Sequence, residues 1–177
     1  MSHSKERNYI IQHDDYSCGP IALINSYYHL YNKYPCDCPI TEYPRKAIDQ
    51  IGKECETTKT HGTELWNLSH NSIIQLKKTT YNINKILNYD AFILLYSFKQ
   101  HPETQHKRLD KKDDQDVVAH YIFVHKTDDN YKIHNDRILH NEEYMANPVL
   151  NKEQFTTKYL KHNPRIEGLD FPVAWVI

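Results

Sequence analysis

Apolar residues recur at helical spacing near the start of the chain. A stripe with intervals of three or four residues consists of Ile21, Ile24, Tyr28 and Tyr31. Ser17 precedes the stripe and suits a helix N-cap, and Pro20 suits the first turn because its missing N–H costs nothing there. The pattern therefore predicts a helix from Cys18 to about Tyr31.

Three further helices are expected before residue 90, from the same kind of spacing. One begins near Pro44 and has an apolar face made of Ala47, Ile48, Ile51 and Cys55. Another runs from Thr63 to about Lys77, with the inward positions Leu65, Leu68 and Ile73 or Ile74. A short one covers residues 83–87.

From residue 91 the pattern changes to runs of strand length. Residues 91–98 are almost continuously apolar, as in a central strand that is covered on both faces. Residues 117–125 are rich in β-branched and aromatic side chains and predict a second strand. The sequence Asp128-Asp129-Asn130 predicts a hairpin turn into a third strand over residues 131–134.

The C-terminal part adds one more helix and one more strand. Asn151 caps the predicted helix, which buries Phe155, Tyr159 and Leu160, and residues 171–177 predict a fourth strand. Helices first and an antiparallel sheet second are the order of an α+β protein. A length of 177 residues favours one domain, which we place at residues 10–177 after a polar arm of residues 1–9.

Charge and hydropathy exclude several classes of function. The chain has 22 Lys and Arg against 23 Asp and Glu, so it has no general basic field for nucleic acid. Its longest apolar run, Ala91–Tyr96, is far shorter than the roughly 18 residues of a membrane helix. No apolar segment follows Met1 as a signal peptide would require. We expect a cytoplasmic protein with neither a membrane nor a nucleic-acid partner.

Four cysteines are present, and nothing in the chain indicates secretion, so we expect reduced thiols. Cys36 and Cys38 are too close in sequence for half of a typical zinc site, and no second Cys or His pair follows. Zinc held by distant ligands is the alternative. We expect neither a metal nor an organic cofactor, and we interpret Cys36, Cys38 and Cys55 as packing thiols.

Cys18 has the surroundings of a nucleophile. A cysteine in the first turn of a helix lies at the positive end of the helix dipole, which favours the thiolate. Gly19 removes a side chain where the backbone of a substrate would approach. Gln12, six residues before Cys18, is a neutral donor that can join the Cys18 backbone N–H in an oxyanion hole.

A base and a group that orients it complete the set. His120 lies within the second predicted strand, where a half-polar side chain needs a reason to be present. Asp136 follows the third strand, sixteen residues after His120, and can fix the tautomer and orientation of its ring. Asn135 takes this role if the register shifts by one residue.

The order of these motifs resembles the papain-like cysteine peptidases, most closely the C39 and C39-like peptidases. The matching parts are Gln12, Cys18-Gly19, His120-Tyr-Ile-Phe-Val124 and Asn135-Asp136. The resemblance covers most of residues 10–177 and implies a papain-like fold, with N-terminal helices packed on a C-terminal antiparallel sheet. It also implies a peptidase that hydrolyses a peptide or isopeptide bond with the triad Cys18, His120 and Asp136, without a cofactor.

The chain departs from this family at three places. Arg137 stands where the family usually has Pro, and Ser17 stands where it commonly has Asp. The spacing from Cys18 to His120, 102 positions, exceeds the usual one, and the charged loop 99–116 can supply the excess. This loop is expected to be solvated, with a cover over the site as the alternative.

Other residues receive ordinary interpretations. Tyr27, Tyr28 and Tyr31 are expected in the core, and His13, His125 and His134 are expected to be surface or network residues. The expected partner is a peptide or protein substrate, and the sequence does not predict an oligomeric state. Two alternatives remain: an acyltransferase that resembles transglutaminases or phytochelatin synthases, and a non-catalytic peptide-binding module on the same scaffold.

Overall fold

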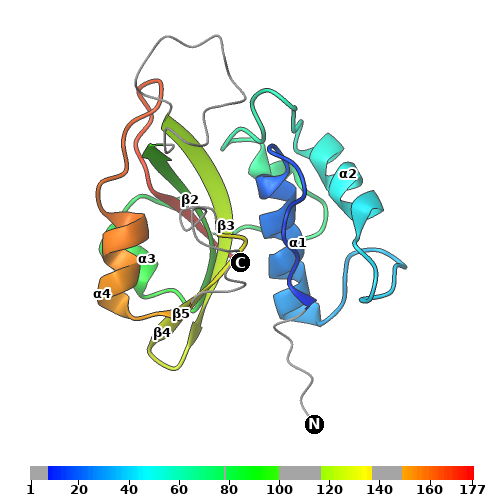
Figure 1. Cartoon of the computed structure of the whole chain (residues 1–177), viewed down its shortest axis with the longest axis horizontal. Helices are drawn as coiled ribbons and strands as arrows, with labels where there is room; N and C mark the ends of the chain where they lie inside the picture. Colours follow the sequence, from blue (N-terminus) through cyan, green and yellow to red (C-terminus); the bar gives the residue numbers. More distant parts are fainter. Residues whose placement is uncertain (1–7, 78, 100–116, 137–148) are drawn as a thin grey trace.

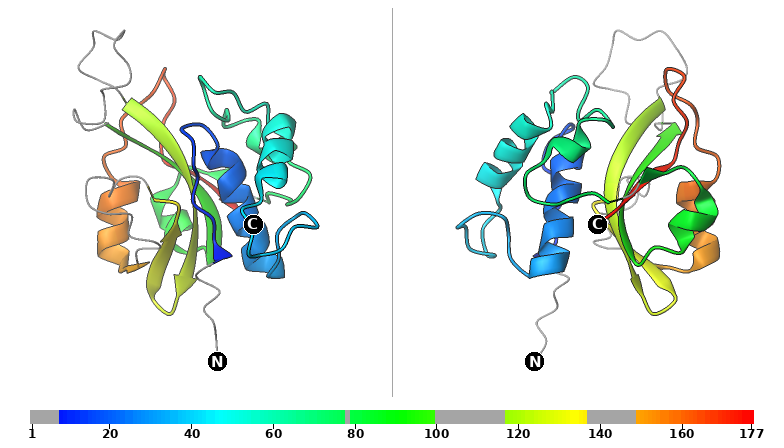
Figure 2. Two further views of the ribbon diagram at one scale, coloured as in Figure 1. Left: turned by 45° about the vertical axis from the view of Figure 1, so that its right-hand side comes forward. Right: turned by 180° about the vertical axis from the view of Figure 1, so that it is seen from behind.

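A six-stranded antiparallel sheet separates two layers of helices in the computed structural model, which describes residues 8–77, 79–99, 117–136 and 149–177. One layer contains α1 (Cys18–Tyr31) and α2 (Arg45–Glu54), and the other contains α3 (Ile83–Leu87) and α4 (Lys152–Phe155) (Figure 1). The same layers are visible from behind in Figure 2. The predicted α+β class is confirmed.

The strand β2 lies in the interior of the sheet. The strands are β1 (Thr79–Thr80), β2 (Ala91–Lys99), β3 (Val117–Thr127), β4 (Asn130–His134), β5 (Val149–Leu150) and β6 (Val173–Val176), and their spatial order is β1-β6-β2-β3-β4-β5. Ile93 and Leu95 belong to the core cluster on the α1 side, whereas Phe92, Leu94 and Tyr96 belong to the cluster on the α4 side. The prediction of a strand covered on both faces is therefore confirmed.

Most predicted elements occur with nearly the expected bounds. The helix α1 covers the predicted residues, α2 buries Ala47, Ile48 and Ile51, and the hairpin between β3 and β4 turns at Asp128. Asn151 and Gln154 form a reciprocal capping box before α4, which continues into a π-helical turn, η4 (Thr156–Leu160). Tyr31 is an exception: it is the last residue of α1 and is 56% exposed.

The helix expected over residues 63–77 is wrong, because side chains in this segment take over the backbone donors. Asn71 Oδ1 accepts hydrogen bonds from the backbone N–H groups of Ile73 (3.1 Å) and Ile74 (2.8 Å). The backbone N–H of Ser72 donates to Glu54 Oε1 at 2.8 Å. The side chains of Asn71 and Glu54 compete with helical hydrogen bonds in this way, and only a short 3₁₀ turn, η2 (Leu68–His70), forms.

The N-terminal segment 8–12 is held along α1 by the connection between α1 and α2. The Tyr34 hydroxyl donates to the backbone carbonyl of Asn8 at 2.7 Å, and the Tyr43 hydroxyl donates to that of Ile11 at 2.9 Å. Tyr9 stacks on His134 with ring centroids 3.7 Å apart. Asn8 and Tyr9, the described part of the expected polar arm, therefore pack against the folded chain.

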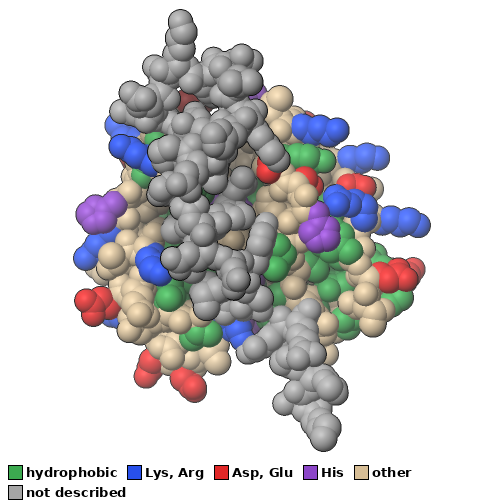
Figure 3. All heavy atoms as spheres, viewed as in Figure 1, with side chains coloured by type: hydrophobic (Ala, Val, Ile, Leu, Met, Phe, Trp, Pro, Cys, Tyr) green, Lys and Arg blue, Asp and Glu red, His purple; other side chains and the backbone are tan. Residues whose placement is uncertain are grey.

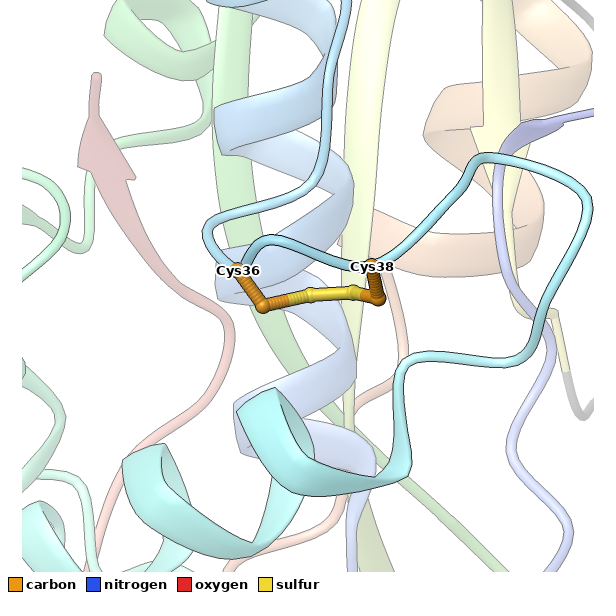
Figure 4. Close-up of a disulfide and its surroundings, with 2 residues drawn as sticks. All are labelled: Cys36 and Cys38. Carbon is orange, nitrogen blue, oxygen red and sulfur yellow. A yellow bond between two sulfur atoms is a disulfide. The ribbon is translucent and has the colours of Figure 1, made fainter.

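A disulfide joins Cys36 and Cys38 in the same connection (Figure 4). Their Cα atoms are 5.2 Å apart, which is within the range that a disulfide spans. The expectation that all four cysteines are reduced is therefore wrong at this pair. Cys18 and Cys55 carry thiols, and both are buried.

Among the described residues, no helix is long and apolar enough to cross a membrane. Acidic and basic side chains lie in the same regions of the face seen in Figure 3. Residues 100–116 of the charged loop, and Arg137, lie outside the described residues.

Asp14 holds the turn that leads into α1, whereas the Ser17 side chain does not form the predicted cap. Ser17 occupies the N-cap position, but its side chain makes no capping bond. Asp14 Oδ1 instead accepts from the backbone N–H groups of Tyr16 (3.0 Å) and Ser17 (2.8 Å), and Oδ2 accepts from the Ser17 hydroxyl at 2.6 Å. Arg45, at the start of α2, lies 3.6 Å from the same carboxylate.

These contacts set the ionisation of Asp14. Burial raises its pKa, but the hydrogen bonds from Ser17 and Tyr16 and the charge of Arg45 together lower it below the ordinary 3.8. A carboxyl group whose pKa is lowered in the folded state stabilises that state above its unfolded pKa. This contribution is lost as the pH falls through the folded pKa.

We predict that Asp14→Ala lowers the free energy of unfolding at neutral pH by about 1 kcal/mol, the usual net contribution of a hydrogen bond between a side chain and the backbone. Asp14→Asn keeps an acceptor for both N–H groups and should lose less. Urea denaturation from neutral pH to below 3.8 should show the difference between wild type and Asp14→Asn shrinking toward acid. A difference in the free energy of unfolding that is constant with pH would contradict an ionised Asp14 carboxylate in the folded protein.

Candidate active site

Cys18 is the first residue of α1 and is 8% exposed. The strand β3 packs against α1. Burial is the main cause that raises the pKa of Tyr121 well above 10.0, and the Cys18 charge is the second. The Tyr121 hydroxyl donates to the backbone carbonyl of Thr63 at 3.0 Å, which ties β3 to the segment beside the helix start.

Thr63 leaves no room for a side chain at position 19. It fills the space beside Gly19 that we expected for a substrate backbone. A Cβ atom at Gly19 would lie 2.5 Å from Thr63 Oγ1 and 2.8 Å from Thr63 Cβ. Thr63 is itself fixed, since its hydroxyl pairs with that of Thr57 at 2.6 Å. The expected role of Gly19 in substrate approach is therefore wrong, and its role is close packing at the start of α1.

His120 is oriented by a backbone carbonyl. It lies in β3 opposite Tyr96, is 2% exposed, and meets the Tyr96 ring edge to face at 5.9 Å between centroids. His120 Nε2 lies 2.6 Å from the backbone oxygen of Asn135. A carbonyl oxygen only accepts, so Nε2 carries the proton and the lone pair of the neutral ring is on Nδ1.

Gln12 and Asn135 are joined by two hydrogen bonds, although 123 residues separate them in sequence. The backbone N–H of Gln12 donates to Asn135 Oδ1 at 3.1 Å, and Asn135 Nδ2 donates to Gln12 Oε1 at 2.8 Å. Gln12 Nε2 donates to the backbone carbonyl of Asp14 at 2.7 Å. The amide of Gln12 is thus held in the loop that leads into α1, and one Nε2–H remains for an oxyanion.

Asp136 is held by two tyrosine hydroxyls. Its Oδ1 accepts from Tyr159 at 2.7 Å and from Tyr96 at 3.5 Å. Burial, followed by the charge of Asp136, raises the pKa of Tyr159 well above 10.0, which keeps this hydroxyl protonated as a donor. Because the Tyr96 ring also contacts His120, the carboxylate is connected to the ring of the candidate base through Tyr96.

The structure thus brings together three of the predicted parts: Gln12, the Asn135-Asp136 pair and His120. Cys18, the first residue of α1, follows the loop in which Gln12 is held. Sequence reasoning missed the two tyrosines that hold Asp136. The register of β2 opposite β3 was the signal that could have found Tyr96, whereas no local pattern points to Tyr159.

The three histidines that were predicted to lie outside the site have different surroundings. His13 is exposed and stacks on Tyr43 at 4.0 Å between centroids. His125 and His134 stack on each other at 5.0 Å between ring centroids, and His134 is fully buried rather than at the surface. Among the described residues, no group of three His, Cys, Asp or Glu side chains is arranged to hold a metal ion.

Cys55 contrasts with Cys18. It is fully buried below α2, and its thiol lies 3.7 Å from the backbone carbonyl of Leu68. Burial, and next the charge of Glu54, raises its pKa from 9.0 to about 12. Cys55 is therefore a packing thiol, as predicted, and serves as an internal reference for the reactivity of Cys18.

We predict that Gly19→Ala lowers the free energy of unfolding by about 1–3 kcal/mol, because the new methyl group overlaps Thr63. Gly52→Ala in α2 is the matched control: its Cβ would meet nothing closer than 3.8 Å. That variant should gain up to about 1 kcal/mol from the better helix propensity of Ala. Urea denaturation measures both, and equal stabilities would contradict the packing role of Gly19.

Comparison of the chain with protein-family models, with curated proteins and with solved structures found no significant match. The role of each residue at the candidate site therefore depends on its own contacts in this structure.

Proposed function

We propose that this protein is a papain-like cysteine peptidase that hydrolyses a peptide or isopeptide bond at Cys18. His120 acts as the base, Gln12 and the Cys18 backbone N–H form the oxyanion hole, and Asp136 stabilises the charged imidazole ring. The observation that carries the proposal is the hydrogen-bonded chain from Gln12 through Asn135 to His120 beside the start of α1. These residues come from three distant parts of the sequence, in the order of the family motif.

The protonation state of His120 suits a general base. With its proton on Nε2, the neutral ring presents the Nδ1 lone pair, which can take the proton of the Cys18 thiol. The resulting imidazolium donates from Nε2 to the Asn135 carbonyl, and charge-assisted bonds of this kind are stronger than neutral ones. The thiolate therefore gains a cationic neighbour whose orientation is already set.

In this site the imidazolium of His120 must stabilise the Cys18 thiolate more strongly than in a site where the helix dipole alone favours the thiolate. Asp14 places a negative charge at the start of α1 and accepts two of the nearby backbone N–H groups. That charge opposes a second anion at Cys18, although Arg45 partly compensates it. We therefore assign most of the thiolate stabilisation to the imidazolium of His120.

The reaction then follows in two steps. The Cys18 sulfur attacks the carbonyl carbon, and the oxyanion is held by Gln12 Nε2 and the Cys18 N–H. The C–N bond breaks, His120 gives its proton to the leaving amine, and a thioester remains on Cys18. Water, deprotonated by His120 Nδ1, attacks the thioester and releases the acid, and the proton returns to the thiol.

The structure gives the two alternatives no separate support. An acyltransferase would use the same groups and pass the acyl group to an amine or thiol instead of water. A binding module would need none of the described orientation of His120 and Gln12. Retention of these contacts favours catalysis.

We predict that p-nitrophenyl acetate acetylates wild-type protein at Cys18, with a burst of p-nitrophenol. Cys18→Ala should abolish the burst, and His120→Ala should slow it by about 10²-fold or more, as for a lost general base. Peptide mass spectrometry should find Cys55 unmodified, because burial raises its pKa to about 12. The exposed His70 provides a matched control variant, His70→Ala, with wild-type kinetics.

A burst that survives in His120→Ala would contradict the base, and no acetylation of Cys18 would contradict the enzyme in favour of a binding module.

Cleavage is tested with a peptide library made from a proteome digest, with and without an added primary amine. We predict that wild-type protein generates new carboxyl termini and new amino termini in equal amounts, and that Cys18→Ala generates neither. Products that carry the added amine in place of a free carboxylate would assign the protein to the acyltransferases.

A further inference from the structure

We propose that Asn135 is a positioning residue that sets the oxyanion donor and the base at the same time. Its side chain fixes the amide of Gln12, and its backbone carbonyl fixes the ring of His120. The inference deepens the proposed function and rests on it. It assigns to Asn135 a task different from the side-chain contact with His120 for which sequence reasoning considered this residue.

The orientation of both amide groups follows from the backbone groups at the two ends of the chain of hydrogen bonds. At one end, the backbone N–H of Gln12 only donates, so it requires the oxygen of Asn135. This places Asn135 Nδ2 against the Gln12 side chain, where it requires Oε1. At the other end, the backbone carbonyl of Asp14 only accepts, so it requires Gln12 Nε2.

Turning over the Gln12 amide alone is therefore unfavourable twice. It would place Nε2 against the Nδ2 donor of Asn135, and it would place Oε1 against the carbonyl oxygen of Asp14. Asn135 thereby keeps the nitrogen of Gln12 on the side of the loop that leads to Cys18. An oxyanion needs a donor there, and the oxygen of an inverted amide would repel it.

The backbone of Asn135 makes both contacts possible. It follows the last residue of β4 and has φ of 66°, in the left-handed region that Asn adopts more readily than most residues. This conformation ends the regular strand and lets the carbonyl reach His120 while the side chain reaches Gln12. Asn135 is 6% exposed, so water competes little for either contact.

The account separates Asn135 from Asp136. Asp136 is held by the hydroxyls of Tyr159 and Tyr96, and these contacts do not involve Gln12. Changes at Asn135 should therefore act on the oxyanion donor, whereas changes at Asp136 should act on the charge around His120.

The test compares two reactions of Cys18 that differ in one requirement. Acetylation by p-nitrophenyl acetate forms an oxyanion, whereas alkylation by iodoacetamide displaces iodide and forms none. We expect Asn135→Asp to lower the acetylation rate by roughly 10²-fold, as for a lost oxyanion donor. The new carboxylate still accepts from the Gln12 N–H but repels Oε1, so the Gln12 amide turns over. The rate of alkylation at neutral pH should stay near the wild-type value.

A second variant guards against a folding defect. Asn135→Gly accepts the left-handed backbone, keeps the carbonyl on His120, and removes both side-chain bonds to Gln12. It should also lower acetylation and spare alkylation. In the background of Gln12→Ala, the addition of Asn135→Gly should change acetylation little, because both substitutions remove the same donor.

The outcomes distinguish the two levels of the proposal. Equal losses of acetylation and alkylation in both variants would overturn the positioning role in favour of a purely structural one. Acetylation that Gln12→Ala slows, but that both Asn135 variants leave unchanged, would overturn the role of Asn135 alone. A wild-type protein that is not acetylated at Cys18 would overturn the proposed function and, with it, the role of Asn135.

Discussion

The two hydrogen bonds between Gln12 and Asn135 are the constraint on which the candidate site depends. They connect the loop before α1 to the end of β4, across 123 residues of sequence. The Asn135 carbonyl extends the connection to His120 on β3. The two tyrosines that hold residues 8–11 from the other side keep the Gln12 segment against α1. The segment before α1 and the sheet are therefore joined at this point by the side chain and the backbone carbonyl of one residue, Asn135.

Burial strengthens the hydrogen bonds of this arrangement, and it also means that a charge at the site requires a partner of opposite charge. Cys18, His120 and Asn135 are 8%, 2% and 6% exposed, so little water screens their charges and hydrogen bonds. A thiolate in such a place requires a charged partner, and the carboxylate of Asp14 near the helix start increases that requirement. The same burial limits the access of water to a thioester intermediate, which needs one water molecule at its carbonyl carbon for hydrolysis.

Local patterns predicted most of the fold, because α1 and α2 have apolar residues at helical spacing and the strands β2 to β4 are apolar runs of strand length. They failed where side chains bond the backbone across a few residues: Asn71 accepts hydrogen bonds from the backbone in place of a helix over 63–77, and Asp14 bonds the backbone before α1 where a Ser17 cap was predicted. The order of motifs predicted the residues of the site but not how they contact one another. Gly19 against Thr63, and Asn135 between Gln12 and His120, depend on long-range packing and on a left-handed residue that no periodicity reveals.

The central claim is that Cys18 and His120 form a thiolate–imidazolium pair. The most direct test is the alkylation rate of Cys18 by iodoacetamide as a function of pH, measured by mass spectrometry in wild type and in His120→Ala, with Cys55 as the internal reference. The account predicts that Cys18 reacts far faster than Cys55 below neutral pH and loses this advantage without His120. A Cys18 that titrates like an ordinary thiol, with a pKa near ~8.5 in both proteins, would contradict it.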